Sequence, residues 1–458
     1  MLRNPQERLR RLQRSEVRLG KVHPDGPDVY LTPRDRTQHL YSIGRSGFGK
    51  TTMLRNLIAQ DLLIGHGLAV LAPDDQFFRD DLMPAIPEHR IQDVIYVDPE
   101  DGDRPIPLNP LHLAPGERLH EKVDETLRSF LRLVEGQADA AGAHRMQRIL
   151  RHALATLIEI PGRTLLDFHR LLGRDEEGNR FRQWAAPQIS DEVTRTFWQR
   201  DYKDFPKDAH QSVLSRLDSL LTPPVRNLLC TPGACLNFRE AMDSNKVLLF
   251  RLTANALQGA GNAGVVGQLV VGKLNLAARS REDIREEDRR FFPIFIDEFQ
   301  EFCGASVDDY RTMFSRLRKY GVPLTIAHLE TGDFSEGLVR HILGTVSTFV
   351  FFQMNHSDAK RLSHEMIVRD ADGRLVPIDP ALLGSPPKGF AYCKVNGKVA
   401  LVRMDPPRRG GSQLTVRRAV THSRNTYGVP ANTPVMPGRP PAPIPPGSID
   451  DLEPGSPF

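Results

Sequence analysis

The segment Gly44–Thr51, with the sequence GRSGFGKT, constrains the fold more than any other stretch of the chain. An apolar run suited to a buried strand, 39–43, precedes it, and a run with helical periodicity, 52–59, follows it. This is the phosphate-loop pattern in the strand-to-helix context that such a loop requires. A chance glycine-rich turn is the alternative, but the motif is complete and correctly placed. The sequence therefore predicts a nucleoside triphosphate site.

The residue types of this loop match the chemistry of phosphate binding. Gly44, Gly47 and Gly49 let the backbone curl so that successive N–H groups point toward phosphate oxygens. Lys50 supplies positive charge for the β- and γ-phosphates, and the Thr51 hydroxyl is a ligand for Mg²⁺. The following helix contributes the positive end of its dipole. The predicted nucleotide-binding residues are Gly44, Arg45, Ser46, Gly47, Phe48, Gly49, Lys50, Thr51 and Thr52.

The predicted second half of the site lies at the end of a later apolar run, 294–296, which is followed by Asp297 and Glu298. In phosphate-loop proteins the nucleotide lies at the carboxyl ends of the strands, where both carboxylates would reach it. We expect Asp297 to hold Mg²⁺ through its water shell and Glu298 to polarise the attacking water. An Asp-Glu pair alone is weak evidence for a catalytic site, but downstream of a complete phosphate loop it predicts ATP hydrolysis.

Short apolar runs alternate with helical stretches, and this alternation predicts an α/β fold with a mostly parallel sheet. From about 115 to 240 the leucines have helical spacing and no convincing strand interrupts them, so we expect an all-helical insertion. Two late runs around Asn396-Gly397 predict a terminal hairpin. The expected strands are 28–31, 39–43, 67–71, 94–97, 246–252, 292–298, 323–328, 349–353, 389–394 and 398–404.

The two ends of the chain are expected to lie outside the folded core. Residues 1–20 predict a basic amphipathic helix with a solvated face; contact with DNA, an anionic membrane or the protein body are alternatives. Beyond Pro406 few apolar residues remain, so the tail is expected to be disordered. Its acidic end, 450–453, is either a partner-binding peptide or a plain flexible tail. The charged run 279–290 is expected to be a solvated loop.

The chain thus divides into five expected parts. They are 1–27 (a basic helix or arm), 28–114 (first part of the ATPase domain), 115–240 (the all-helical insertion), 241–405 (second part of the ATPase domain) and 406–458 (a basic and then proline-rich tail).

Net charge, cysteine spacing and the lengths of the apolar runs bear on nucleic-acid binding, zinc binding and membrane insertion. A net charge of +4 over 458 residues does not by itself indicate nucleic-acid binding. The closest cysteine pair, Cys230 and Cys235, has no second pair or nearby histidines, so reduced thiols fit better than zinc. No apolar run approaches the 18 residues of a membrane span, and no signal peptide opens the sequence. These features predict a soluble, cytoplasmic protein.

Several stretches, taken in order, resemble the HerA/FtsK superfamily of ring-shaped ATPases, in particular the conjugative coupling proteins of type IV secretion. The ordered series spans about 31 to 404 and is more specific than the phosphate loop alone. The matching text is HLYSIGRSGFGKTT (39–52), DVIYVDPED with PIPLNPL (93–111), KVLLFRL (246–252), FIDEFQEF (295–302), RLRKYGVPLTIAH (316–328) and TVSTFVFFQMNHSDAKRL (345–362).

This resemblance implies a RecA-like ATPase that assembles as a homohexamer, with ATP and Mg²⁺ at subunit interfaces and DNA or protein moving through or along the ring. A relaxase or secretion-channel proteins are the implied partners, and peripheral membrane association is compatible with it. Arg318 matches the family's arginine finger, a fixed cation that stabilises the transition state in the neighbouring subunit. The alternative is that Arg318 and Lys319 complement the dipole of their helix before Gly321.

The sequence departs from the family pattern in three places. Leu329 stands where the family often has a glutamine, and leucine cannot contact a phosphate or orient a water. The strand after the phosphate-loop helix ends in 72–76 with a shifted register, where Asp74 or Asp75 stands in for the usual acidic residue. Membrane-anchored members begin with a transmembrane segment that this sequence lacks, so it resembles the soluble members.

Three functions remain open at this point. The first is a DNA-translocating motor for conjugative or mobile-element transfer, which predicts DNA-stimulated hydrolysis with a steep salt dependence. The second is a secretion ATPase that moves protein, for which DNA would be irrelevant. The third is a structural or defence ring with slow hydrolysis, which Leu329 keeps open.

Overall fold

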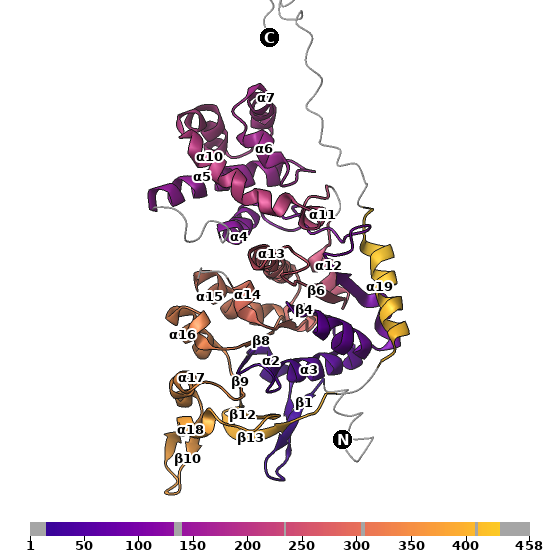
Figure 1. Cartoon of the computed structure of the whole chain (residues 1–458), viewed down its shortest axis with the longest axis vertical. Coiled ribbons are helices and arrows are strands. Elements are labelled where there is room, and N and C mark those ends of the chain that lie inside the picture. The colour runs from indigo at the N-terminus through magenta and orange to yellow at the C-terminus, as the bar shows by residue number, and fades with distance from the viewer. Residues whose placement is uncertain (1–14, 132–139, 233–234, 304–306, 408–410, 431–458) are drawn as a thin grey trace, which may run out of the picture.

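The computed structural model of the chain describes residues 15–131, 140–232, 235–303, 307–407 and 411–430. Its body is an 11-stranded sheet with helices on both faces, and a helical domain lies beyond one face (Figure 1). The predicted α/β class with a mostly parallel sheet and an all-helical insertion is confirmed. The expectations for residues 1–14 and 431–458 lie outside the described residues.

The sheet has a parallel part and an antiparallel extension. Its strand order is β2-β1-β13-β12-β9-β3-β8-β7-β4-β6-β5, and every neighbouring pair from β9 to β5 is parallel. A separate two-stranded sheet joins β10 and β11. The strands are β1 (Val17–Val22), β2 (Asp28–Leu31), β3 (Leu40–Ile43), β4 (Leu68–Ala72), β5 (Val94–Val97), β6 (Val247–Arg251), β7 (Ile294–Ile296), β8 (Leu324–His328), β9 (Thr348–Phe351), β10 (Ile367–Arg369), β11 (Leu375–Pro377), β12 (Phe390–Val395) and β13 (Lys398–Met404).

The helices fall into two groups. The helical domain contains α4 to α11, and the rest pack around the sheet (Figure 1). Their bounds are α2 (Pro33–Thr37), α3 (Lys50–Ile64), α4 (Leu119–Leu131), α5 (Ala140–Glu159), α6 (Asp167–Leu172), α7 (Glu176–Ala185), α8 (Glu192–Thr196), α9 (Tyr202–Asp204), α10 (Lys207–Leu217), α11 (Val225–Leu229), α12 (Phe238–Asp243), α13 (Ala260–Arg279), α14 (Phe299–Phe302), α15 (Val307–Arg316), α16 (Glu336–Thr345), α17 (His356–Leu362), α18 (Pro380–Leu383) and α19 (Gln413–Tyr427).

The continuous apolar strands separate two cores, one on each face of the sheet. In β4, Ala69 and Leu71 belong to one core, whereas Leu68 and Val70 belong to the other, as the period of two requires. The first core continues into α13 and the helical domain, and the second contains α3. Burial on both faces explains why these strands lack polar alternation.

The basic helix expected over residues 1–20 is wrong for the part that the structure describes. Val17 and Leu19 are buried with the half-buried Arg18 between them, the period of two of a strand, and this stretch forms β1. Arg18 is held between β2 and the end of the terminal hairpin by Asp28 and Asp405. Carboxylates on neighbouring segments thus accommodate the charge that suggested a solvated face.

The expected disorder beyond Pro406 is wrong for α19. Val416, Ala419 and Val420 form an apolar stripe that joins the core beside α3, and α19 contacts the edge strand β5. The buried Ser423 hydroxyl accepts a hydrogen bond from the backbone N–H of Tyr96 at 2.7 Å. Helix α19 thus satisfies a backbone donor of the edge strand β5. Edge strands expose unpaired backbone groups, and a covering helix shields them.

Within the described residues, no helix combines the length and apolar character needed to cross a bilayer.

Candidate active site

The phosphate loop lies at the carboxyl end of β3 and is fixed by both neighbouring strands. The N–H of Gly44 donates to the carbonyl of His328 at 3.3 Å, and the N–H of Arg45 donates to the carbonyl of Gln353 at 2.7 Å. Gly44 has a φ of 153°, and a Cβ there would lie 2.6 Å from Cβ of Phe352. Only glycine therefore fits between the loop and β9.

Helix α3 begins at Lys50 directly after the loop. Gly49 is its N-cap and supplies no side-chain hydrogen bond, so the first N–H groups of the helix remain available for phosphate oxygens. The predicted loop residues 44–52 therefore lie together, around the amino end of one helix.

Lys50 is folded back onto the loop. Its side chain is only 4% exposed, and Nζ donates to the carbonyl of Gly44 at 2.6 Å and to that of Arg45 at 3.3 Å. Burial lowers the pKa of Lys50, an effect that Glu298 and Asp297 oppose. An ammonium group that has only carbonyl partners and nearby carboxylates is suited to receive phosphate oxygens.

Asp297 follows β7 and faces the start of α3. Thr51 Oγ1 donates to Asp297 Oδ2 at 2.9 Å, so the two predicted magnesium ligands are brought together. Burial raises the pKa of Asp297 to about 6, and the charge of Glu298 adds to this shift. A hydroxyl and a carboxylate suit Mg²⁺, which prefers oxygen ligands and retains several waters. These two residues therefore fit the expected ion.

Glu298 stands at the sharp turn between β7 and α14. Its φ of 49° is in the left-handed region, and its N–H donates to Asp297 Oδ1 at 3.1 Å. Gln300 Nε2 donates to Glu298 Oε2 at 2.8 Å and so orients the carboxylate. Backbone strain of this kind persists where the surrounding structure enforces it and clusters at active sites. Gln300 was not among the predicted site residues; its only signal in the sequence is its place two residues after Glu298.

Arg318 lies near the amino ends of the parallel strands, whereas the residues described above lie at the carboxyl ends. It belongs to the short helix η10 (Leu317–Tyr320), which precedes β8, whereas the phosphate loop and Asp297 follow their strands. Burial lowers the pKa of His39 to about 4, and Arg318 adds to this shift, so Arg318 is near the amino end of β3. The five residues of β8 separate the amino ends of the strands from the carboxyl ends by roughly 15 Å. Arg318 therefore cannot serve the site of its own chain.

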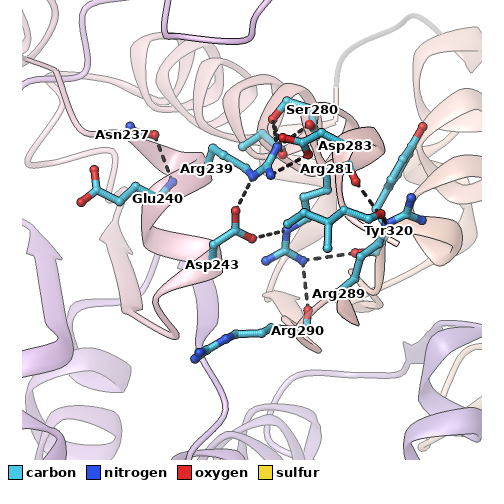
Figure 2. A network of polar contacts seen from close by, with 12 residues as sticks. Asn237, Arg239, Glu240, Asp243, Ser280, Arg281, Asp283, Arg289, Arg290 and Tyr320 are labelled. Atoms are coloured by element: carbon cyan, nitrogen blue, oxygen red, sulfur yellow. Dashed lines mark hydrogen bonds and ion pairs between the residues drawn. The ribbon is translucent and has the colours of Figure 1, made fainter. Parts of the chain in front are cut away.

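Two arginines hold the turn that carries Arg318. Arg289 Nη1 donates to the carbonyl of Lys319 at 2.5 Å. Arg281 Nη1 donates to the carbonyl of Tyr320 at 3.2 Å (Figure 2). The guanidinium of Arg289 also lies over the Tyr320 ring, 5.3 Å from its centre. The backbone of the turn is thus fixed while Arg318 itself is exposed.

Arg281 is fully buried, which corrects the expectation that 279–290 is a solvated loop. Its Nε lies 2.9 Å from Asp243 Oδ1, and Asp243 also pairs with Arg239 (Figure 2). A buried guanidinium needs such a partner, and the local sequence does not reveal it. The network links α12, which leads back into the sheet, to the turn of Arg318.

If this turn positions Arg318, Arg289→Ala will lower the rate of ATP hydrolysis about 10- to 100-fold with nucleotide affinity unchanged. Steady-state kinetics and ATP titration measure the two effects, and thermal unfolding checks the fold. Arg285→Ala is the matched control, because Arg285 is in the same run, is 76% exposed and pairs only with Glu287 and Asp288 among the described residues. Equal rates for both variants would contradict the role of Arg289.

Leu329 follows β8 and is 37% exposed, beside a buried polar pair. His328 Nδ1 donates to the carbonyl of Glu330 at 3.0 Å, so the Tyr41 hydroxyl donates to Nε2 at 2.7 Å. Burial lowers the pKa of His328 to about 3, which keeps the ring neutral. Asn355 Nδ2 donates to Glu330 Oε2 at 3.3 Å. The side chain at 329 supplies no polar group here.

Asp74 and Asp75 have structural partners. Asp75 Oδ1 lies 2.5 Å from Nη1 of Arg251, a fully buried residue at the end of β6 that also pairs with Asp98 and Glu100. Asp74 accepts backbone N–H groups of its own turn. An arginine inside an apolar strand was the sequence signal for such an anionic cluster.

No protein-family model and no curated protein matches the sequence. Solved structures do match. The bacterial conjugative coupling protein TrwB, without its first 70 residues, has a TM-score of 0.60 and 16% identity, covering 90% of this chain and 93% of that chain. TrwB with a non-hydrolysable ATP analogue has a TM-score of 0.59, 18% identity and coverage of 89% and 94%. TrwB has also been solved with ADP and Mg²⁺, at a TM-score of 0.57, 17% identity and coverage of 84% and 89%.

VirB4 of Thermoanaerobacter pseudethanolicus matches with a TM-score of 0.54 and 14% identity, covering 88% of this chain and 98% of that chain. At these identities the likeness shows a shared fold, and the shared fold extends over nearly the whole chain.

Proposed function

We propose that this chain, which has the fold of TrwB and VirB4, is a ring-forming ATPase that uses Mg²⁺ and couples hydrolysis to DNA transfer. The observation that carries the proposal is the contact between Thr51 and Asp297, with Glu298 beside them at the carboxyl ends of the strands. TrwB itself has been solved with ADP and Mg²⁺ and with an ATP analogue.

The loop residues and Lys50 would bind the phosphates. Their N–H groups line the amino end of α3, and the Lys50 ammonium would exchange its carbonyl partners for phosphate oxygens. Thr51 and Asp297 would hold Mg²⁺, which neutralises charge on the phosphates when bound.

Glu298 would orient the attacking water. Its carboxylate is held by Gln300, so it is positioned before the substrate arrives. The contribution of such a group comes from its fixed place within hydrogen-bond reach of the water.

Arg318 would act on the nucleotide of a neighbouring copy. Because Arg318 is exposed near the amino ends of the strands, a head-to-tail ring would bring it to the phosphate loop of the next subunit. We infer a homohexamer from the resemblance in sequence to ring ATPases, and DNA together with a relaxase or channel protein as partners.

A second candidate is an ATPase that moves protein. The resemblance in sequence to ATPases of type IV secretion is compatible with it, and none of the observations on the site distinguishes a protein substrate from DNA. In this case turnover would not respond to DNA.

The two candidates differ in steady-state ATP hydrolysis at low salt, with and without single- or double-stranded DNA. We expect one form of DNA to stimulate the wild type several-fold and Lys50→Ala to show neither tight ATP binding nor turnover. Hydrolysis that is indifferent to DNA would favour the protein-moving ATPase. Tight ATP binding without turnover would indicate a ring that uses nucleotide as a switch.

A further inference from the structure

The helical domain contains a cavity of about 760 Å³ that lies away from the candidate active site. Four cationic side chains line it: Arg174 between α6 and α7, Arg182 on α7, Arg195 on α8 and Lys203 on α9. No lining residue is acidic. We call this the cationic cavity.

None of these four cations lies within 4 Å of a carboxylate in the described part of the chain. Arg182 is only 9% exposed, yet its hydrogen bonds go to neutral acceptors, the carbonyls of Leu171 and Gly173 and the amide of Asn179, each at 2.6 Å. Burial lowers the pKa of Arg182 and the charge of Arg174 adds to this shift, whereas Tyr202 and Asp175 oppose it.

Two of the other guanidinium groups have unused hydrogen-bond donors. The Nε atoms of Arg174 and Arg195 are buried and lack a partner among the described residues. The Nη2 atoms of these side chains again donate to carbonyls, that of Phe205 for Arg174 and those of Ile189 and Ser190 for Arg195. Buried polar atoms without a partner are uncommon in native proteins and call for an explanation.

Other buried arginines of this chain, such as Arg163 and Arg281, also have an Nε atom without a hydrogen-bond partner, but they lie beside carboxylates. Arg36 pairs with Asp61 at 2.6 Å, and Arg281 pairs with Asp243 at 2.9 Å. The protein therefore supplies counterions where a guanidinium is structural.

Around the cationic cavity the Tyr202 ring lies 5.3 Å from the Arg174 guanidinium and 5.1 Å from that of Arg182, but a ring face carries no full negative charge. The lack of a carboxylate partner there indicates that the counterion comes from a ligand.

The lining groups specify the chemistry of that ligand. The exposed amides of Asn179, Gln183 and Gln199 add donors, whereas the aromatic rings of Trp198 and Tyr202 are buried and offer no stacking face. Guanidinium groups and amides match phosphate oxygens, and a site without stacking faces reads the backbone of a strand rather than its bases.

We propose that the cationic cavity binds phosphate groups of a nucleic-acid strand. The choice of a strand over free phosphates rests on the proposed DNA-transfer function, but the site requires no ATP. Binding can therefore be measured whether or not the chain hydrolyses ATP, and failure of one proposal is distinguishable from failure of the other.

The test is fluorescence anisotropy of a labelled single-stranded oligonucleotide with the full chain, over a series of salt concentrations without nucleotide. Lys203→Gln removes an exposed charge and should not disturb folding. The double variant Arg174→Gln/Lys203→Gln removes two charges. Arg180→Gln is the matched control, because Arg180 is on α7, is 66% exposed and pairs with Glu176 at 3.5 Å.

We expect Lys203→Gln to weaken oligonucleotide binding about 3- to 10-fold and the double variant to weaken it further. The slope of log affinity against log salt should decrease by roughly 0.7 for each phosphate that a variant no longer neutralises. Arg180→Gln should match the wild type. Equal affinities and slopes for all four proteins would overturn the proposal.

Competition with pyrophosphate and with a poly-glutamate peptide separates the sources of the anion. Displacement of the oligonucleotide from the wild type by pyrophosphate, but not by the peptide, would support a phosphate site. If the variants lose pyrophosphate binding but keep strand binding, the site takes free phosphates and the assignment to a strand is overturned. If they lose only peptide binding, the proposal is overturned as a whole.

Discussion

Glu298→Gln is expected to bind ATP with near wild-type affinity and to hydrolyse it about 10²- to 10⁴-fold more slowly. The substitution keeps the shape and the possible hydrogen bond to Gln300 but removes the negative charge that orients a water. It leaves the contact between Thr51 and Asp297 intact, so the site for Mg²⁺ and the phosphates should persist. Titration with a fluorescent ATP analogue and single-turnover hydrolysis measure the two quantities separately.

Glu301→Gln is the matched control for this variant. Glu301 lies on the same short helix α14, three residues further on, so the substitution changes the same net charge without altering the proposed catalytic group. Hydrolysis by Glu298→Gln at the wild-type rate would show that the catalytic carboxylate is misassigned. Loss of ATP binding in this variant would instead place Glu298 among the nucleotide ligands.

Arg318→Ala is expected to reduce hydrolysis about 10³- to 10⁵-fold without loss of ATP binding, as for other arginine fingers. Since Arg318 is separated from its own phosphate loop by the length of β8, we propose that its cation acts on the nucleotide of a neighbouring copy. Lys319→Ala is the control: it removes an adjacent exposed charge but leaves the carbonyl that accepts from Arg289.

A mixing experiment decides whether Arg318 acts between subunits. In mixed rings of Arg318→Ala and Glu298→Gln protein, some interfaces combine an intact Arg318 with an intact Glu298. Partial recovery of hydrolysis is therefore expected when both proteins reach the same assembly state, which light scattering can verify. If assembly is equal and activity does not recover, action between subunits is contradicted.

The parts of the site that are continuous in sequence were predictable. Residues 44–52 form a loop whose conformation is encoded locally by its glycines, and Asp297 is delivered by an apolar strand. The structure places Asp297 against Thr51, in agreement with the expected geometry. Roles that depend on contacts between distant segments, such as that of Gln353 beneath the loop, have no local signal.

The two largest errors have the same physical origin. Arginine-rich stretches were expected to be solvated, yet β1 and α19 are held against the sheet. Their apolar residues are few but correctly spaced, and carboxylates from other segments meet the charges, as Asp28 does for Arg18 and Asp101 does for Arg424. Composition alone underestimates burial wherever such partners come from elsewhere in the chain.

The place of β3 in the sheet has a consequence for the order of events during synthesis. Both neighbours of this strand, β8 and β9, are made long after it, and their ends supply the carbonyls of His328 and Gln353 that fix the phosphate loop. A nascent chain that has already exposed the loop still lacks the scaffold that shapes it. If the loop binds nucleotide as proposed, binding is a late property of the maturing polypeptide, gained only when most of the sheet has been translated.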